Sequence, residues 1–134
     1  MVGSYGALVA RAIQSKISEQ RRWLMINAGM NDMIRPALYG AHHRIEPLER
    51  LPGGMSWQVV GPVCESADDF GRYELGEQAP AAVVVRDVGA YGFTLASEYN
   101  GRALPTELFL SGGGVASSSQ SPGTSSWIER RLRA

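Results

Sequence analysis

The run Ala-Ala-Val-Val-Val-Arg-Asp at residues 81–87 constrains the fold more than any other stretch of the sequence. Valine branches at Cβ and is favoured in β-strands, and Pro80 and Gly89 bound the run. Because the centre of the run is apolar without interruption, we expect a strand that is buried on both faces. We therefore expect a β-rich core around this segment.

Further short strands are predicted along the chain. Residues 6–17 fit both a strand and a helix pattern, and we interpret them as a strand that forms a hairpin with residues 22–27. More strands are expected at residues 42–48, 57–61 and 104–110. Short strands at this spacing, without a visible repeat, predict an all-β domain with short helices, either a barrel or a sandwich.

The connecting segments are rich in Gly, Pro, Asn and Ser. A turn or short helical piece is expected at residues 33–40, with Arg35 outside the helical region because Pro36 follows it. Residues 68–73 are interpreted as a polar loop, and residues 94–99 as a segment with one helical turn. Turns are expected at residues 28–32 and 51–54.

The chain is expected to divide near residue 110. Its 134 residues, of which 44% are hydrophobic, can bury one modest core, and we assign that core to residues 1–110. Residues 111–134 form a Ser/Gly-rich tail, predicted to be mobile over residues 111–126 and to end in one or two helical turns at residues 127–132.

Charge and cysteine content exclude several classes of protein. Thirteen basic and thirteen acidic residues leave no formal net charge, so neither nucleic acid nor a membrane surface is an expected partner. The one cysteine excludes an internal disulfide, and no apolar run approaches the roughly 20 residues of a membrane span, so we expect a cytoplasmic protein. His42 and His43 are adjacent, which suits opposite faces of a strand, and no metal site is predicted.

The only cysteine lies beside a carboxylate. Cys64 and Glu65 follow Gly61 and Pro62 at the end of a predicted strand, so they should occupy a rigid loop, where catalytic and binding groups concentrate. Like charges disfavour ionisation, so a thiol beside a carboxylate tends to keep its proton. Cys64 is therefore a candidate proton donor, and the alternative is a small buried apolar residue.

Two other loops carry polar or aromatic groups beside Gly or Pro. Arg35 offers a rigid fork of donors for a carboxylate or phosphate, and Tyr39 adds a hydroxyl four residues later. A glycine-bracketed loop at residues 89–92 presents Tyr91. Because each loop follows a predicted strand, we expect the three to form one composite site; the alternative is a surface arginine and a core tyrosine.

Three motifs resemble one enzyme family. Residues 27–39 (Asn-Ala-Gly-Met-Asn-Asp-Met-Ile-Arg-Pro-Ala-Leu-Tyr), 61–68 (Gly-Pro-Val-Cys-Glu-Ser-Ala-Asp) and 86–93 (Arg-Asp-Val-Gly-Ala-Tyr-Gly-Phe) are similar, in order and spacing, to the C-terminal part of the diaminopimelate decarboxylase family. The resemblance covers about residues 2–110. Decarboxylases of ornithine and arginine share the last two loops, whereas Arg-Pro-Ala-Leu-Tyr and Cys-Glu-Ser favour the diaminopimelate branch.

The resemblance implies a Greek-key-like β-barrel that completes the site of a pyridoxal 5′-phosphate decarboxylase. In that family a TIM-like barrel carries the cofactor lysine, and no such barrel is present in this sequence, whose sole lysine, Lys16, matches no family motif. The complete enzyme would convert meso-2,6-diaminopimelate to L-lysine and carbon dioxide, as a homodimer with sites at its interface. The isolated chain is expected to be inactive.

The resemblance also implies roles for single residues. Arg35 and Tyr39 would bind a substrate carboxylate, and Tyr91 would contact the cofactor phosphate and the substrate. Cys64 would donate the proton that replaces carbon dioxide, and Glu65 would hold the distal amino group. The alternative left open is a stand-alone β-barrel binding or assembly module that keeps these motifs without catalysis.

Overall fold

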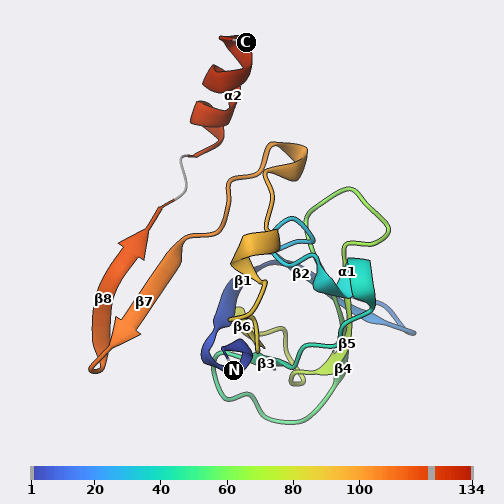
Figure 1. Ribbon diagram of the computed structural model, residues 1–134. Helices are drawn as coiled ribbons and strands as arrows, with labels where there is room; N and C mark the ends of the chain where they lie inside the picture. Colours follow the sequence, from blue (N-terminus) through green and yellow to red (C-terminus); the bar gives the residue numbers. More distant parts are fainter. Residues whose placement is uncertain (1, 121–122, 134) are drawn as a thin grey trace.

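Six strands form one sheet that curls into a nearly closed barrel (Figure 1). The structure is a computed structural model that describes residues 2–120 and 123–133. The strands of the barrel are β1 (Ala7–Ile17), β2 (Arg22–Ile26), β3 (Ile45–Pro47), β4 (Ser56–Val60), β5 (Asp69–Glu74) and β6 (Ala82–Arg86), in the spatial order β3-β6-β1-β2-β4-β5. Neighbours are antiparallel except for β2 and β4, which are parallel. The predicted all-β barrel is confirmed.

Strand β1 joins the two halves of the barrel. Its first half pairs with β6, from Ala7 opposite Arg86 to Arg11 opposite Ala82, and its second half pairs with β2. The register shifts between Ala12 and Gln14, where β1 passes from one partner to the other. The predicted hairpin of the first two strands is confirmed.

The edges of the sheet meet at Tyr73. The hydroxyl of this β5 residue shares its one proton between two carbonyl oxygens, that of His43, just before β3, at 2.8 Å and that of Phe70 at 2.9 Å. The His42 ring stacks on the Tyr73 ring, with 5.3 Å between the ring centroids. Tyr73 thus links the two edge strands, β3 and β5.

The core fills the inside of the barrel. Val83, Val84 and Val85 are all buried, which confirms that β6 is covered on both faces. The largest fully buried side chain is that of Trp57 in β4, whose indole N–H donates to the carbonyl of Gly76 at 2.8 Å. Other buried apolar residues from the strands and loops are Leu24, Ile26, Met33, Ile45, Val59 and Phe70.

Helical pieces and a separate hairpin complete the chain. The helical pieces are η1 (Gly3–Tyr5), α1 (Arg35–Tyr39), η2 (Phe93–Leu95), η3 (Tyr99–Gly101) and α2 (Thr124–Leu132). Strands β7 (Glu107–Ser111) and β8 (Gly114–Ser119) form a two-stranded sheet that stands beside the barrel (Figure 1). No helix of the described residues is long and apolar enough to span a membrane.

The prediction that residues 68–73 form a polar loop is wrong. Asp69–Glu74 is strand β5, which pairs with β4 and buries Phe70 and Tyr73. Gly71, with φ at 101°, lies opposite Val59 where the register shifts. Asp69, Arg72 and Glu74 are exposed, so the strand character of β5 depends on pairing with β4 and not on its own composition.

Two further expectations need correction. Residues 111–126, expected to lack regular structure, contain strand β8 (Gly114–Ser119), which pairs with β7 through a tight turn where Gly112 and Gly113 both adopt positive φ. Residues 121 and 122 of that range lie outside the described residues, and α2 begins three residues before the helix predicted from residue 127.

Arg35 is the first residue of α1, not a residue outside the helical region. Pro36 is tolerated because the first N–H groups of a helix have no helical partner to lose. The strand predicted at residues 42–48 is confirmed only over Ile45–Pro47.

Candidate functional site

Three loops gather at one end of the barrel, the upper end in Figure 1. The first loop (residues 27–40) follows β2 and contains α1, the second loop (residues 61–68) follows β4, and the third loop (residues 87–102) follows β6. All five residues that the sequence proposed for a site lie in these loops. Each loop leaves the barrel at the end of a strand, which is why residues far apart in the sequence meet here.

Asp68 ties the second loop to the first. Its Oδ2 accepts the backbone N–H of Val63 at 2.6 Å, and its Oδ1 accepts that of Met30 at 2.6 Å. A Cβ on Gly61 would lie 2.3 Å from these carboxylate oxygens, so only glycine fits there. The Cys64–Glu65 turn is thereby held against the loop that leads to Arg35.

Asp32 and Arg102 add the third loop to this network. Asp32 Oδ2 accepts the backbone N–H of Gly29 at 2.8 Å and lies 4.0 Å from Nη2 of Arg102. The same guanidinium nitrogen donates to the carbonyl of Asn27 at 2.7 Å. Arg102 therefore braces the third loop against the first through one ion pair and one hydrogen bond.

The two aspartates are buried carboxyls, with 8% of Asp32 and 4% of Asp68 exposed. Burial raises the pKa of both carboxyls above the ordinary value, because the charged form loses water. Backbone N–H donors and the positive charge of Arg102 oppose this shift at each site without cancelling it. The hydrogen bonds that connect the loops thus depend on two carboxyl groups, those of Asp32 and Asp68, for which burial makes ionisation less favourable.

Arg35, Tyr39 and Tyr91 come together above the barrel. The guanidinium carbon of Arg35 lies 5.8 Å from the ring centroid of Tyr39 and 5.7 Å from that of Tyr91. These separations allow a cation–π contact with both rings, and most of each tyrosine side chain remains exposed. We name this group the arginine cluster; it joins residues that the sequence analysis placed on two separate loops.

The backbone of Tyr91 is held in an unfavourable conformation. Its φ is 66°, the left-handed region, which costs a bulky side chain roughly 1–3 kcal/mol. A Cβ on Gly89 would lie 2.2 Å from the carbonyl oxygen of Val2, and one on Gly92 would lie 2.4 Å from that of Val88. The turn is therefore packed directly against backbone, and it presents the Tyr91 side chain to solvent.

Cys64 and Glu65 form a second group with Tyr99. The thiol of Cys64 is free and exposed, so the alternative of a small buried residue is wrong. The Glu65 carboxylate accepts a hydrogen bond from the hydroxyl of Tyr99 in the third loop. We name these three residues the cysteine cluster. Among the described residues, no hydrogen bond, ion pair or ring contact joins it to the arginine cluster.

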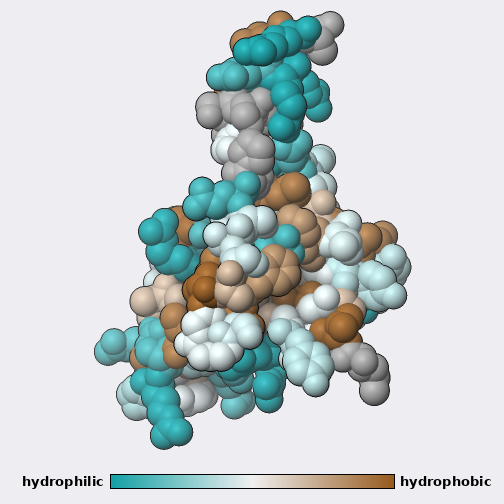
Figure 2. Space-filling view, turned by 60° about the vertical axis from the view of Figure 1, so that its left-hand side comes forward, coloured by the Kyte–Doolittle hydropathy of each residue, from teal (hydrophilic) through white to brown (hydrophobic). Residues whose placement is uncertain are grey.

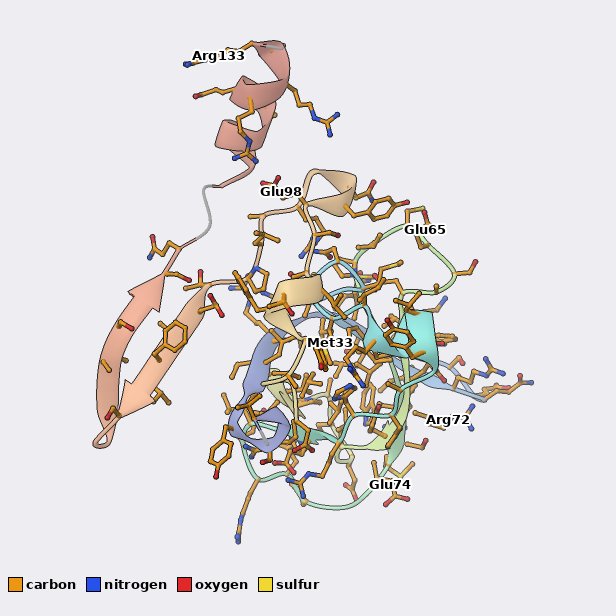
Figure 3. The ribbon with its side chains drawn as sticks, in the orientation of Figure 1. Met33, Glu65, Arg72, Glu74, Glu98 and Arg133 are labelled. Carbon is orange, nitrogen blue, oxygen red and sulfur yellow. The ribbon has the colours of Figure 1, made fainter. Side chains whose placement is uncertain are left out.

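Figure 3 shows Glu65 and Glu98 at the upper end of the barrel, below α2, and away from Arg72 and Glu74 of β5. Glu98 precedes Tyr99 and pairs with Arg130 of α2 at 2.5 Å. The terminal helix is thus attached to the same segment of the third loop that contacts Glu65.

Sequence reasoning missed Tyr99, Arg102 and the connecting role of Asp32 and Asp68. The two aspartates lie inside the motifs at residues 27–39 and 61–68, so a search for buried carboxylates beside glycine could have found them. Tyr99 and Arg102 flank Asn100 and Gly101, both with positive φ, and only the Asn-Gly pair signals that turn. The described residues hold no group of three or more His, Cys, Asp or Glu side chains suited to a metal.

Comparison with known proteins gives a consistent result. Residues 4–89 match the family described as "Pyridoxal-dependent decarboxylase, C-terminal sheet domain". The diaminopimelate decarboxylase of Neisseria meningitidis is 37% identical over 114 residues, which are 84% of this chain and 28% of that protein. The enzyme of the same name from Vibrio cholerae is 41% identical over 109 residues, 80% of this chain and 26% of that protein.

Solved structures show the same likeness. The diaminopimelate decarboxylase of M. jannaschii in complex with L-lysine superposes with a TM-score of 0.88 at 34% identity, covering 96% of this chain and 30% of that one. The Helicobacter pylori enzyme complexed with L-lysine gives a TM-score of 0.80 at 31% identity, covering 99% of this chain and 34% of that one. The chain therefore spans about a third or less of the proteins it resembles.

Proposed function

The chain belongs to the family of pyridoxal-dependent decarboxylase C-terminal sheet domains, and on this premise we propose that it is the C-terminal domain of a diaminopimelate decarboxylase. The complete enzyme would convert meso-2,6-diaminopimelate to L-lysine and carbon dioxide in the cytoplasm. The observation that carries the proposal is the locking of three motif-bearing loops by Asp32, Asp68 and Arg102, which fixes two clusters of polar side chains at one end of the barrel.

The arginine cluster suits a substrate carboxylate. Arg35 carries a permanent positive charge and a planar fork of donors that matches two carboxylate oxygens. Its position beside two aromatic rings limits its motion, and the exposed hydroxyl of Tyr39 can donate to the same group. We assign substrate binding and orientation to Arg35 and Tyr39.

Tyr91 suits the cofactor. Pyridoxal 5′-phosphate, when bound, supplies the electron sink for decarboxylation. The Tyr91 phenol is exposed, is fixed by a tightly packed turn and lies beside the Arg35 guanidinium, so it can donate to an anionic phosphate and contact the substrate. We therefore assign cofactor binding in this chain to Tyr91, and the lysine that binds the cofactor covalently would come from the TIM-like barrel.

The cysteine cluster suits proton donation and recognition of an amino group. Cys64 is exposed, so its Sγ can reach a substrate and donate the proton that replaces carbon dioxide. The Glu65 carboxylate can accept hydrogen bonds from a distal ammonium group. In the family that the chain resembles, the corresponding cysteine and glutamate reach into the site of the partner subunit, and we assign the same role to this cluster in a homodimer.

Exposed apolar side chains offer surfaces on which the TIM-like barrel or the partner subunit could pack. Figure 2 shows hydrophobic residues exposed across the middle of one face, below the hydrophilic end of α2. Exposed apolar residues lie on β1 (Val9, Ile13, Ile17), on β7 (Leu108, Phe109, Leu110) and on β8 (Val115). An isolated two-stranded hairpin is marginally stable in water, so β7 and β8 would be stabilised by such a cover. The stand-alone module is less well supported, since the named relatives are decarboxylases.

The test is reconstitution. The chain, alone and joined to the lysine-bearing barrel, is supplied with pyridoxal 5′-phosphate and meso-2,6-diaminopimelate, and carbon dioxide release is measured. We expect release only from the joined protein. Release of carbon dioxide from the chain alone would contradict the assignment of the cofactor lysine to the TIM-like barrel. If neither protein releases carbon dioxide although the TIM-like barrel is shown to bind cofactor, the proposed function is contradicted.

A further inference from the structure

Tyr99 and Glu65 are joined across two loops. The Tyr99 hydroxyl donates to Oε1 of Glu65, 34 residues away in the sequence. The pKa of Tyr99 is raised, first because Glu65 accepts this hydrogen bond and second because the Glu65 charge disfavours a phenolate; Cys64 adds a smaller effect of the same sign. The Tyr99 phenol is therefore in direct contact with Glu65, the carboxylate of the cysteine cluster.

The backbone that carries Tyr99 is braced. The Ser97 N–H donates to the carbonyl of Asn31 at 2.8 Å, and the Tyr99 N–H donates to the Ser97 hydroxyl at 3.4 Å. On the other side, Arg102 Nη2 donates to the carbonyl of Asn27 at 2.7 Å. Both braces end on the first loop, so the position of the phenol is set by the same network that positions the other two loops.

The hydrogen bond from Tyr99 affects how well the Glu65 carboxylate can bind an ammonium group. An ionised carboxylate has about four acceptor positions, and one phenol hydroxyl occupies only one of them. A glutamate on an exposed loop loses rotamer freedom when it binds a ligand, and this loss weakens binding. The Tyr99 hydroxyl restricts Glu65 before binding and leaves its other acceptor positions available to an ammonium group.

We propose that Tyr99 is a positioning residue that determines specificity, holding the Glu65 carboxylate ready for the distal ammonium group of a diamino acid. The inference rests on the proposed function, because it requires Glu65 to bind substrate. Its effect is selective: a substrate or inhibitor without the distal amino group makes no use of an oriented Glu65. A residue with a merely structural role would affect both kinds of ligand alike.

The first test uses the holoenzyme that contains this chain and its lysine-bearing barrel. The KM and kcat for meso-2,6-diaminopimelate and the inhibition constant of 2-aminopimelate, which lacks the distal amino group, are measured for the unaltered protein, Tyr99→Phe and Tyr5→Phe. Tyr5, the most exposed tyrosine at 88%, is the matched control. We expect Tyr99→Phe to raise KM roughly three- to tenfold, because an unrestrained Glu65 side chain must then be ordered on binding, with kcat and the inhibition constant within about twofold.

An equal loss for substrate and inhibitor, or no change in KM, would overturn the inference while leaving the proposed function intact. The inference also predicts the behaviour of a double variant: in a protein that already carries Glu65→Gln, adding Tyr99→Phe should not change KM further. If the unaltered holoenzyme binds cofactor and yet turns over no diaminopimelate, the proposed function is what fails.

The second test needs no enzyme activity. The chain is labelled with ¹³C at tyrosine Cζ, and the phenol of Tyr99, identified by its absence in Tyr99→Phe, is titrated by NMR. Glu65→Gln should lower the pKa of Tyr99, whereas Glu98→Gln, a change of the same charge at the adjacent residue, should not. An unchanged Tyr99 pKa in Glu65→Gln would remove the contact on which the inference stands.

Discussion

Asp68 and Met30 are 38 residues apart and are joined by a hydrogen bond of 2.6 Å from the Met30 N–H to Oδ1 of Asp68. With the bond from Val63 to the other carboxylate oxygen, this contact makes Asp68 the link between the loop of Cys64 and the loop of Arg35. The geometry of the proposed site is therefore set by a residue that has no proposed role in binding or proton transfer.

We predict that Asp68→Ala destabilises the chain by about 2–4 kcal/mol, because two buried N–H groups lose their acceptor. Glu74→Ala, which removes an exposed carboxylate of β5, should cost under about 1 kcal/mol. Urea denaturation followed by tryptophan fluorescence measures both values. Equal costs for the two variants would contradict the linking role of Asp68.

The raised pKa values of Asp32 and Asp68 predict a pH dependence of stability. A carboxyl with a raised pKa in the folded state binds its proton more tightly there than in the unfolded chain, so its contribution is fully present below the ordinary value of 3.8 and is lost as pH rises through the folded-state value. The loss of unfolding free energy in Asp68→Asn should therefore be largest below pH 3.8 and shrink towards neutral pH. Urea titrations of both proteins across that range check the trend, and a loss that grows with pH would contradict it.

Tyr91→Gly and Tyr91→Ala separate strain from side-chain contact. Both variants remove the phenol, but only glycine relieves the left-handed backbone at this position. We expect the glycine variant to be more stable than the alanine variant by about 1 kcal/mol, as measured by thermal or urea unfolding. In the holoenzyme both should bind cofactor less tightly. An alanine variant that matched the glycine variant in stability would show that the turn stores no strain.

Cys64→Ala should lower kcat of the holoenzyme by about 10²-fold or more, the usual size of a proton-transfer contribution, without a change in stability because the thiol is exposed. Carbon dioxide release and thermal unfolding provide the two readouts. Unchanged turnover would sink the assignment of Cys64 as the proton donor.

Arg35→Ala should raise KM for the diamino acid about tenfold or more, through loss of a charged hydrogen-bonding partner for its carboxylate. Cofactor loading, followed by the absorbance of bound pyridoxal 5′-phosphate, should persist because Tyr91 remains. Arg44→Ala, a change of an exposed arginine outside the three loops, serves as the control. Loss of cofactor with normal KM would contradict the assignment.

Much of the fold could be predicted from local sequence. The valines of β6, the partial alternation in β1 and the apolar run of β2 act within each segment, so local sequence was sufficient there. Strand β5 could not be predicted, since Asp69 and Gly71 disfavour a strand and only pairing with β4 explains it. Strand β8 was missed for a related reason: its serines have little apolar surface, and the positive φ of Gly112 and Gly113 creates the hairpin.

The candidate site also contains features that the sequence predicts and features that only the structure shows. The sequence predicted one composite site from the three loops. The structure brings Arg35, Tyr39 and Tyr91 into contact, whereas Cys64 and Glu65 lie in a second cluster that no contact among the described residues joins to the first. The hydrogen bond between Glu65 and Tyr99 could not be predicted from the sequence, because it depends on a turn with positive φ and on hydrogen bonds from distant loops. The roles given to these residues stay predictions until the variants are measured.

The double pairing of β1 has a consequence for synthesis on the ribosome. The segment from Ala7 to Arg11 pairs with residues 82–86, so its partner is synthesised only after the roughly seventy residues between the two segments. Until then the nascent chain presents an unpaired strand edge, the kind of surface through which chains aggregate. Such distant pairing also slows folding, because a long loop must close before the contact forms. A pause in translation before β6 would prolong that exposure, and a chaperone that covers the N-terminal strand would shorten it.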